Sequence, residues 1–411
     1  MKLDLVQTLA LAGVVLFIGY AVRRVLPILG RLNVPAPVIG GLLAAVAVLV
    51  ARKTGLPIPE YDTTLQRPLM VAFFTTIGFS ASLALLRVGG PKVASLLAIV
   101  TVFAILQNLV GMVLAVSFGL SPLFGVLTGS VTLTGGPATG LAFAPLFEQA
   151  GITGAASIAV AAGMAGIVLG GLVGGPVGTW LIERNGLRGG REKVSAHVEM
   201  VADLELDSSE RVAASAADAD DSEQVYAALK TIVAVLVAMW IGSGISAWVV
   251  AAGVTLPEYI GAMLVAALIR NIDDRTGWFG LSSRALDLLG AVALSLFLVM
   301  ALMTLDLTQL AGLALPLLVI LLAQVVVASL ACLWPVFPFM GRDYDAAVTA
   351  GGFLGFIMGT TANAMAVMRS LVERFGAAPQ AFLVAPLVGA FFLDFTNALI
   401  ITVFLNLFGP G

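Results

Sequence analysis

The chain has 411 residues, of which 60% are hydrophobic and 11% are charged, and its formal net charge is −3. A soluble domain carries about 25% charged residues, so this composition, with a mean hydropathy of +1.05, indicates a polytopic integral membrane protein. The net charge excludes a nucleic-acid-binding surface, and the single Cys332 and single His197 exclude disulfide scaffolds, Cys/His metal sites and His-dependent catalysis.

Five predicted spans fill the first half of the chain. The first opens at Leu5 with almost no positive charge before it and no small-residue cleavage site after it, so we expect a retained helix and not a removed signal peptide. Apolar segments separated by charged residues and Pro/Gly clusters place the spans near 5–22, 37–51, 69–86, 93–118 and 152–182.

A polar segment separates the two halves. Residues 183–223 hold 11 of the 24 acidic residues, together with Ser and Ala and without apolar periodicity, which indicates a solvated acidic linker over 184–225. His197 falls in this linker, and we interpret it as a surface residue. Five more spans are predicted after the linker, near 226–251, 257–270, 285–303, 309–333 and 380–407.

The distribution of basic residues predicts the orientation of the chain. Four of the 21 basic residues fall on one side of the predicted membrane and the other 17 on the opposite side, which the positive-inside rule identifies as the cytoplasm. We therefore expect both termini outside the cytoplasm and a cytoplasmic linker. Because each half has five spans, the second half enters the membrane from the opposite side. The predicted fold is all-α, with about ten helices in two inverted repeats, 1–183 and 226–411. The four basic residues outside are Lys2, Arg52, Lys53 and Arg67.

Two apolar, glycine-rich stretches remain between the fourth and fifth spans of the halves, at about 121–147 and about 346–368. A shift of 225 residues superposes Glu148 on Glu373, and it also aligns the Gly/Thr clusters at 134–136 and 359–361. Non-helical backbone at membrane depth is tolerated only where it is buried in protein or lines a wet cavity, and such broken segments form the substrate sites of inverted-repeat transporters. We therefore predict two re-entrant hairpins at a substrate site. The alternative is a pair of glycine-rich packing helices.

Nearly the whole chain outside the linker resembles the bacterial sodium/glutamate symporters. The resemblance implies a secondary active transporter for Na⁺-coupled uptake of L-glutamate by alternating access, multi-pass in the bacterial cytoplasmic (inner) membrane, with Na⁺ as the co-transported ion. It also implies a homodimer in which a static scaffold, the first two spans of each half, holds a mobile, elevator-like core. The stretches that carry it are VPAPVIGGLL (34–43), RPLMVAFFTTIGFSASL (67–83), QNLVG (107–111), TLTGGPATG (132–140), GIVLGGLVGGPVG (166–178), LSLFLVMALMTLDL (294–307), GRDYDAAV (341–348) and AFLVAPLVGAFFLDFTNALI (381–400).

Three hairpin positions depart from the pattern of that family. Pro137 and Ala138 stand where its first hairpin usually has His and Gly, and Ala362 stands where its second usually has Pro. These changes bear on substrate selectivity more than on transport. A sodium-coupled symporter of another small carboxylate or dicarboxylate, such as aspartate or a 2-hydroxycarboxylate, is therefore the alternative function.

An amino-acid dicarboxylate needs donors for two carboxylates and acceptors for an ammonium group. Backbone N–H groups at half-helix N-termini bind anions, glycines let a substrate approach them, and Thr and Asn side chains donate or accept. Thr hydroxyls in membrane helices also bond to their own backbone, which is the alternative for single residues of this set. The predicted substrate-binding residues are Gly135, Gly136, Thr139, Gly140, Thr360, Thr361 and Asn363.

Asp394 lies in the middle of the last predicted span. A carboxylate there costs about 2.5–3.5 kcal/mol on insertion scales, so it must face a partner or a wet cavity. Asn397 shares its helical face, and Asn108 in the fourth span adds an amide oxygen, with Gln107 as a further donor. Because carboxylate and amide oxygens suit a hard cation, we predict Asp394, Asn397 and Asn108 as Na⁺ ligands. The alternative for Asp394 is a structural hydrogen bond to Ser or Thr of a neighbouring helix.

Other classes of protein lack their characteristic residues in this sequence. Tyr344 and Asp345 form the Tyr-Asp pair of intramembrane aspartyl proteases, but they lie at a membrane edge and no Gly-x-Gly-Asp accompanies them. Serine and metal chemistry lack a His partner, and no ring of charges or carbonyl filter indicates a channel. Arg369 and Arg374 follow the second hairpin, where positive-inside anchoring explains them better than a carboxylate clamp. We therefore expect no enzyme.

Overall fold

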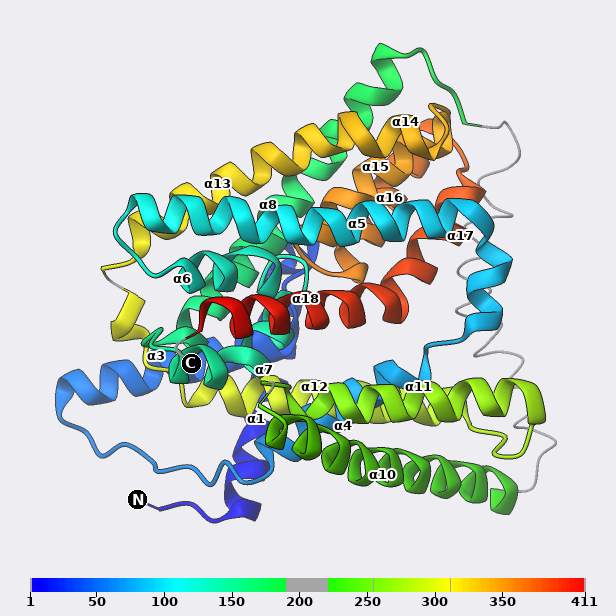
Figure 1. Ribbon diagram of the computed structural model, residues 1–411. Coiled ribbons are helices and arrows are strands. Elements are labelled where there is room, and N and C mark those ends of the chain that lie inside the picture. Colours follow the sequence, from blue (N-terminus) through cyan, green and yellow to red (C-terminus); the bar gives the residue numbers. More distant parts are fainter. Residues whose placement is uncertain (1, 190–220, 254, 311, 410–411) are drawn as a thin grey trace.

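The structure, a computed structural model, describes residues 2–189, 221–253, 255–310 and 312–409. Every named element in these ranges is a helix (Figure 1), and seven of the helices there are long and apolar enough to cross a membrane. This confirms the prediction of an all-helical, polytopic membrane protein, while the count of ten spans stays a prediction. Most of the acidic linker, with His197, lies outside the described residues.

One set of helices, here called the first helix group, occupies the lower part of Figure 1. Helix α1 packs on α3 and α10 packs on α11; α4 and α12 contact each other, α4 also packs on α10 and α11, and α12 contacts both pairs. The bounds of these helices are α1 (Leu5–Val25), α3 (Ala36–Thr54), α4 (Gln66–Phe79), α10 (Asp221–Ala251), α11 (Glu258–Thr276) and α12 (Ser283–Met303).

Glycines bring the paired helices of the first group into backbone contact. A Cβ atom on Gly19 of α1 would collide with the Ala36 carbonyl oxygen of α3. A Cβ atom on Gly242 of α10 would collide in the same way with the Ala262 backbone of α11. Small residues allow this close approach in membrane helix packing, so each pair has no room for a side chain at its crossing point.

The remaining long helices form the second helix group, which contains the two glycine-rich stretches. Helix α15 packs on α8 and α16, α7 packs on α8, and α5 packs on α6, α13 and α17. Buried Phe103, Phe353 and Phe356 belong to its largest apolar cluster. The bounds are α5 (Leu83–Ser117), α6 (Pro122–Val126), η1 (Leu127–Val131), α7 (Gly136–Gln149), α8 (Ala155–Arg184), α13 (Ala314–Ala331), η3 (Cys332–Val336), α14 (Phe337–Met340), α15 (Tyr344–Ile357), α16 (Thr361–Phe375), α17 (Pro379–Leu387), η4 (Val388–Phe392) and α18 (Leu393–Phe408); α2 (Pro27–Arg31) and η2 (Leu307–Leu310) are short connections.

Some helix bounds differ from the predicted spans. Helix α16 continues to Phe375, beyond residue 368, because its charged residues lie on one face and its apolar residues on the other. The predicted span 380–407 is divided into α17 and α18 by a π-helical turn. The predicted span 69–86 also contains a break, because α4 ends at Phe79 and α5 begins at Leu83.

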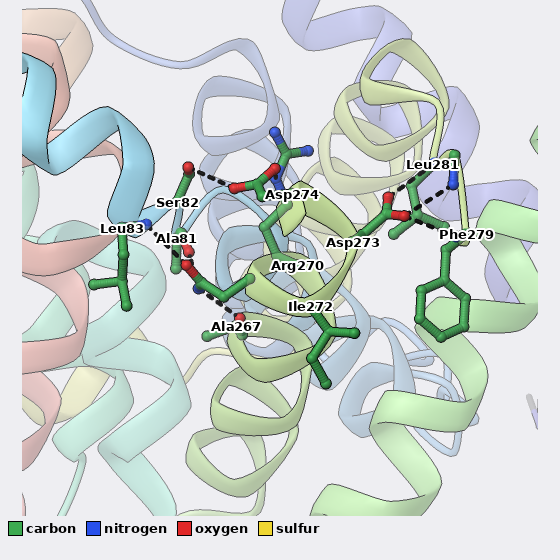
Figure 2. A network of polar contacts seen from close by, with 12 residues as sticks. Ala81, Ser82, Leu83, Ala267, Arg270, Ile272, Asp273, Asp274, Phe279 and Leu281 are labelled. Carbon is green, nitrogen blue, oxygen red and sulfur yellow. Dashed lines mark hydrogen bonds and ion pairs between the residues drawn. The ribbon is translucent and has the colours of Figure 1, made fainter. Parts of the chain in front are cut away.

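The break between α4 and α5 is the first point at which the chain passes from the first helix group to the second. The Asn271 side chain of α11 holds this connection, since its Nδ2 donates to the Ala81 carbonyl oxygen (2.6 Å) and its Oδ1 accepts from the Leu83 N–H (2.9 Å). The Ser82 hydroxyl donates to the Asp274 carboxylate at 2.6 Å (Figure 2). The end of α11 therefore fixes the position at which α5 starts.

Candidate functional site

A cavity of about 440 Å³ lies where the two helix groups meet. Its wall comes from the end of α1, the start of α3, the middle of α4 and α12, the starts of α7 and α16, and the first turn of α18. Most of the lining is apolar, and its polar or charged side chains are those of Tyr20, Arg23, Thr134, Thr139, Ser295, Thr360, Thr361 and Asp394.

The turns before α7 and α16 lie next to each other at this cavity. A Cβ atom on Gly136 would lie 3.4 Å from both the Gly359 carbonyl oxygen and the Thr360 Cγ2 atom. Gly136 has a φ of 70°, a left-handed conformation that favours glycine. Helix α7 begins at Gly136 and α16 begins at Thr361, and these residues are 225 positions apart, the shift found in the sequence. The two aligned Gly/Thr clusters are therefore helix starts at one cavity.

The two helix starts differ in how their backbone N–H groups are used. In α16, the Thr360 hydroxyl caps the helix by accepting from the Asn363 N–H at 3.3 Å. Within the described residues, no side chain caps α7, whose N-cap is Gly135. Pro137 has no N–H, so the uncapped donors of the first turn belong to its neighbours. An uncapped helix start with its positive dipole end at a cavity is suited to bind an anion.

Two of the predicted substrate residues do not line the cavity. A Cβ atom on Gly140 would lie 2.9 Å from the Ala159 Cβ, so Gly140 allows α7 to pack closely on α8. The Asn363 Nδ2 donates to the Ile167 carbonyl oxygen (3.1 Å), and its Oδ1 accepts from the Asn33 Nδ2 (3.1 Å). The predicted residues that do line the cavity are Gly135, Gly136, Thr139, Thr360 and Thr361.

Two of the predicted cation ligands meet at one residue of η1, Ser130. The Asn108 Oδ1 accepts from the Ser130 N–H (2.9 Å), and the Asn397 Nδ2 donates to the Ser130 carbonyl oxygen (3.0 Å). All three residues are buried, and Asn108 Nδ2, Ser130 Oγ and Asn397 Oδ1 have no hydrogen-bond partner within the described residues. Buried polar atoms are almost always paired, so these two oxygens are candidates for a ligand. Asp394, one turn before Asn397, lines the cavity.

Gln107 connects the two turns instead of offering a free oxygen. Its Oε1 accepts from the Thr134 hydroxyl (2.5 Å), and its Nε2 donates to the Ile357 carbonyl oxygen (2.8 Å). Thr134 lies in the turn before α7, and Ile357 ends α15 just before the turn that leads to α16. The Gln324 Nε2 also donates to the Gln107 carbonyl oxygen at 2.7 Å. A single buried side chain thus holds both turns in position.

The basic residues show where sequence reasoning missed the site. Arg374, considered above as a carboxylate clamp, pairs with Glu183 (3.0 Å) and does not line the cavity. Arg23, which the sequence marked only as part of the orientation signal, does line it. Ser130 was also missed, although it lies in the first glycine-rich stretch. The position of Arg23 depends on how α1 packs against α12, a helix more than 200 residues further along the chain, and no local sequence pattern indicates this packing.

A polytopic membrane protein with broken helices that begin at a shared cavity has the features of the class of secondary transporters. A family model described as sodium/glutamate symporter matches residues 1–377. The sodium/glutamate symporters of Escherichia coli and Shigella flexneri are each 38% identical to this chain over 415 residues, covering 98% of both chains. The sodium/glutamate symporter of Haemophilus influenzae is 35% identical over 398 residues, covering 97% of this chain and 96% of its own. The chain therefore belongs to the sodium/glutamate symporter family, and it is a transporter and not an enzyme.

Proposed function

We propose that this chain carries L-glutamate across the bacterial cytoplasmic (inner) membrane together with Na⁺. The observation that carries the proposal is the pair of helix starts, α7 and α16, at one cavity that both helix groups line. Membership of a family whose curated relatives are named sodium/glutamate symporters supports the substrate and the ion.

In this proposal the substrate lies at the two turns. The Gly135 N–H already donates to the Ser130 carbonyl oxygen, so the N–H groups that donate to a carboxylate are those of Gly136 and the rest of the uncapped first turn of α7, which the glycines let the ligand approach. The hydroxyls of Thr139, Thr360 and Thr361 donate to a carboxylate or accept from the ammonium group. Gly140 and Asn363 act indirectly, by fixing α7 and α16 against α8.

The proposed Na⁺ site lies at Ser130 of η1. The partnerless Oγ of Ser130 and Oδ1 of Asn397 are neutral oxygen ligands, and Asn108 holds the backbone of η1 in place through the Ser130 N–H. Asp394, on the same face of α18, supplies the negative charge. Within the described residues, no cluster of three or more His, Cys, Asp or Glu side chains forms a metal site. A bound cation would therefore depend on neutral oxygens and this one carboxylate.

We also propose the finer architecture that the sequence predicts. Each half, 1–183 and 226–411, is an inverted repeat with a re-entrant hairpin, and the linker 184–225 is cytoplasmic while both termini are outside. The helix starts Gly136 and Thr361 are separated by the same 225 residues that align the two Gly/Thr clusters, and this supports the repeat. The packing of α1 on α3 and of α10 on α11 supports a scaffold built from the first two spans of each half. A homodimer with an elevator-like core completes the proposal, and cross-linking in membranes tests it.

The experiment that tests the function is uptake into proteoliposomes of purified protein. An inward Na⁺ gradient should drive accumulation of labelled L-glutamate, and replacement of Na⁺ by K⁺ should abolish it. Competition by unlabelled aspartate and 2-hydroxycarboxylates tests the alternative substrates. That alternative has structural support, because Pro137, Ala138 and Ala362, which depart from the family pattern, all line the cavity. Na⁺-driven uptake of another acid but not of glutamate would replace the proposed substrate.

A further inference from the structure

We infer that the Arg23 guanidinium binds the side-chain carboxylate of the substrate and thereby makes the protein prefer a dicarboxylic amino acid to its neutral amide. The inference deepens the proposed function and rests on it. It concerns a residue of α1, which belongs to the first helix group, whereas the helix starts α7 and α16 belong to the second.

The position of Arg23 is the first observation. It lies in the last turn of α1, three residues after Tyr20, and both residues line the cavity. Residues three apart share one face of a helix, so this face of α1 forms part of the wall. The Arg23 side chain is neither fully buried nor fully exposed. It therefore lies at the edge of the cavity, where a ligand can reach it.

The charge of the cavity is the second observation. Among the described residues that line it, Arg23 is the only one with a positive charge and Asp394 the only one with a negative charge. Ion pairs elsewhere occupy other arginines, such as Arg52 with Asp306 (2.7 Å) and Arg67 with Glu258 (2.6 Å). None of the ion pairs within the described ranges includes Arg23. A guanidinium without a carboxylate partner beside an otherwise mostly neutral cavity is suited to an anionic ligand.

The distribution of polar groups identifies which carboxylate Arg23 would bind. Most of the groups that an α-amino-acid head requires lie on the wall formed by the second helix group, namely the uncapped backbone N–H donors of α7 and the threonine hydroxyls, while Tyr20 and Ser295 add hydroxyls from the first group. Arg23 lies on the wall formed by the first group. A substrate held by its head at the two turns therefore extends its side chain toward α1. A carboxylate at the end of that side chain can form two parallel hydrogen bonds with a guanidinium, whereas an amide lacks the charge.

Arg24 provides a matched control. It is the next residue in the same last turn of α1, and it has the same favourable interaction with the helix dipole and the same expected role in orientation. It does not line the cavity. If Arg23 served only the dipole or the membrane orientation, Arg23→Gln and Arg24→Gln would have similar effects.

The experiment measures how L-glutamate and L-glutamine inhibit Na⁺-driven uptake of labelled L-glutamate in proteoliposomes. We expect Arg23→Gln to weaken inhibition by glutamate about tenfold to hundredfold, the loss typical of a hydrogen bond between charged groups. Inhibition by glutamine, weaker in the wild type, should stay unchanged, so the preference for glutamate falls by the same factor. Arg24→Gln should keep wild-type values. Arg23→Lys, which keeps the charge without the planar geometry, should lie in between.

The inference is overturned if Arg23→Gln keeps the wild-type preference, or if Arg24→Gln loses as much of it. Equal weakening of both ligands would also overturn it, because that result indicates a general defect of the site. Arg23→Lys decides the case if Arg23→Gln does not fold, since full wild-type preference in the Lys variant would exclude a paired hydrogen bond. A wild-type protein without Na⁺-dependent glutamate uptake would overturn the proposed function as well, so the two failures are distinguishable.

Discussion

Replacement of Gln107 by Leu tests whether one side chain holds the two turns of the site together. The change keeps the approximate volume and removes two buried hydrogen bonds, to the Thr134 hydroxyl and to the Ile357 carbonyl oxygen. A hydrogen bond between membrane helices is worth about 0.6 kcal/mol on average and up to about 1.7 kcal/mol. Loss of both bonds should therefore cost about 1–3 kcal/mol. If substrate binding requires the two turns to be held in place, the affinity should fall about fivefold to 150-fold.

Two measurements separate positioning from simple bracing. Binding of L-glutamate in Na⁺ to the purified protein gives the affinity, and thermal unfolding in detergent gives the stability. Thr101→Val on the same helix is the control, because the Thr101 hydroxyl donates to the Leu97 carbonyl oxygen of its own helix. The control should change neither affinity nor stability appreciably. A Gln107→Leu protein with lower thermal stability but wild-type affinity would show that Gln107 braces the fold without positioning the turns.

Three further predictions concern the cation, the turns and the topology. Asp394→Asn should shift the Na⁺ dependence of the initial uptake rate to higher Na⁺ concentration, because it removes the negative charge of the proposed cation site. The protein should still fold, because an amide is easier to bury than a carboxylate. An unchanged Na⁺ dependence would remove Asp394 from the cation site. Gly136→Val should abolish substrate binding, because it puts a β-branched residue at a φ of 70° beside the second turn. Gly151→Val is the control, since Gly151 has a φ of 90° with open space around it, and this variant should still bind substrate. Equal effects of the two changes would assign the loss to backbone strain. On a background with Cys332 replaced, a cysteine in the linker should resist an impermeant reagent in whole cells while one near Gly411 reacts, and labelling of the linker from outside would contradict the inverted repeat.

Much of the fold could be predicted because membrane helices leave a strong pattern in the sequence. Leu5 and Leu83–Ser117 illustrate the limits of that pattern. The first helix begins where the apolar run begins, and the Asp4 and Gln7 side chains form a capping box at that start, so hydropathy and a local capping pattern agree. The break before Leu83 could not be predicted, because it depends on Asn271, whose side chain binds the backbone on both sides of the break and lies 188 residues away in the sequence.

The site was predictable where the two halves repeat each other. Gly136 and Thr361 stood out because a duplicated Gly/Thr cluster has no simple explanation in packing, and the structure places both at one cavity. Arg23 had no such signal, since a basic residue at the end of a membrane helix is what orientation alone predicts. Asn363 shows another limit of the sequence, because its position in the cluster suggested substrate contact, whereas in the structure its amide bonds to Asn33 and to α8.

The short connection between α4 and α5 limits how far the two helix groups can separate. Three residues lie between Phe79 and Leu83, and a chain of this length spans about 10 Å when fully extended. This tether is roughly two turns of helix long, and Asn271 holds it in a folded form. A larger separation of Phe79 from Leu83 would have to unwind the end of α4 or the start of α5. The tether thus keeps the end of α4 close to the start of α5, and the next break in the path to the second group is the non-helical Gly90 inside α5.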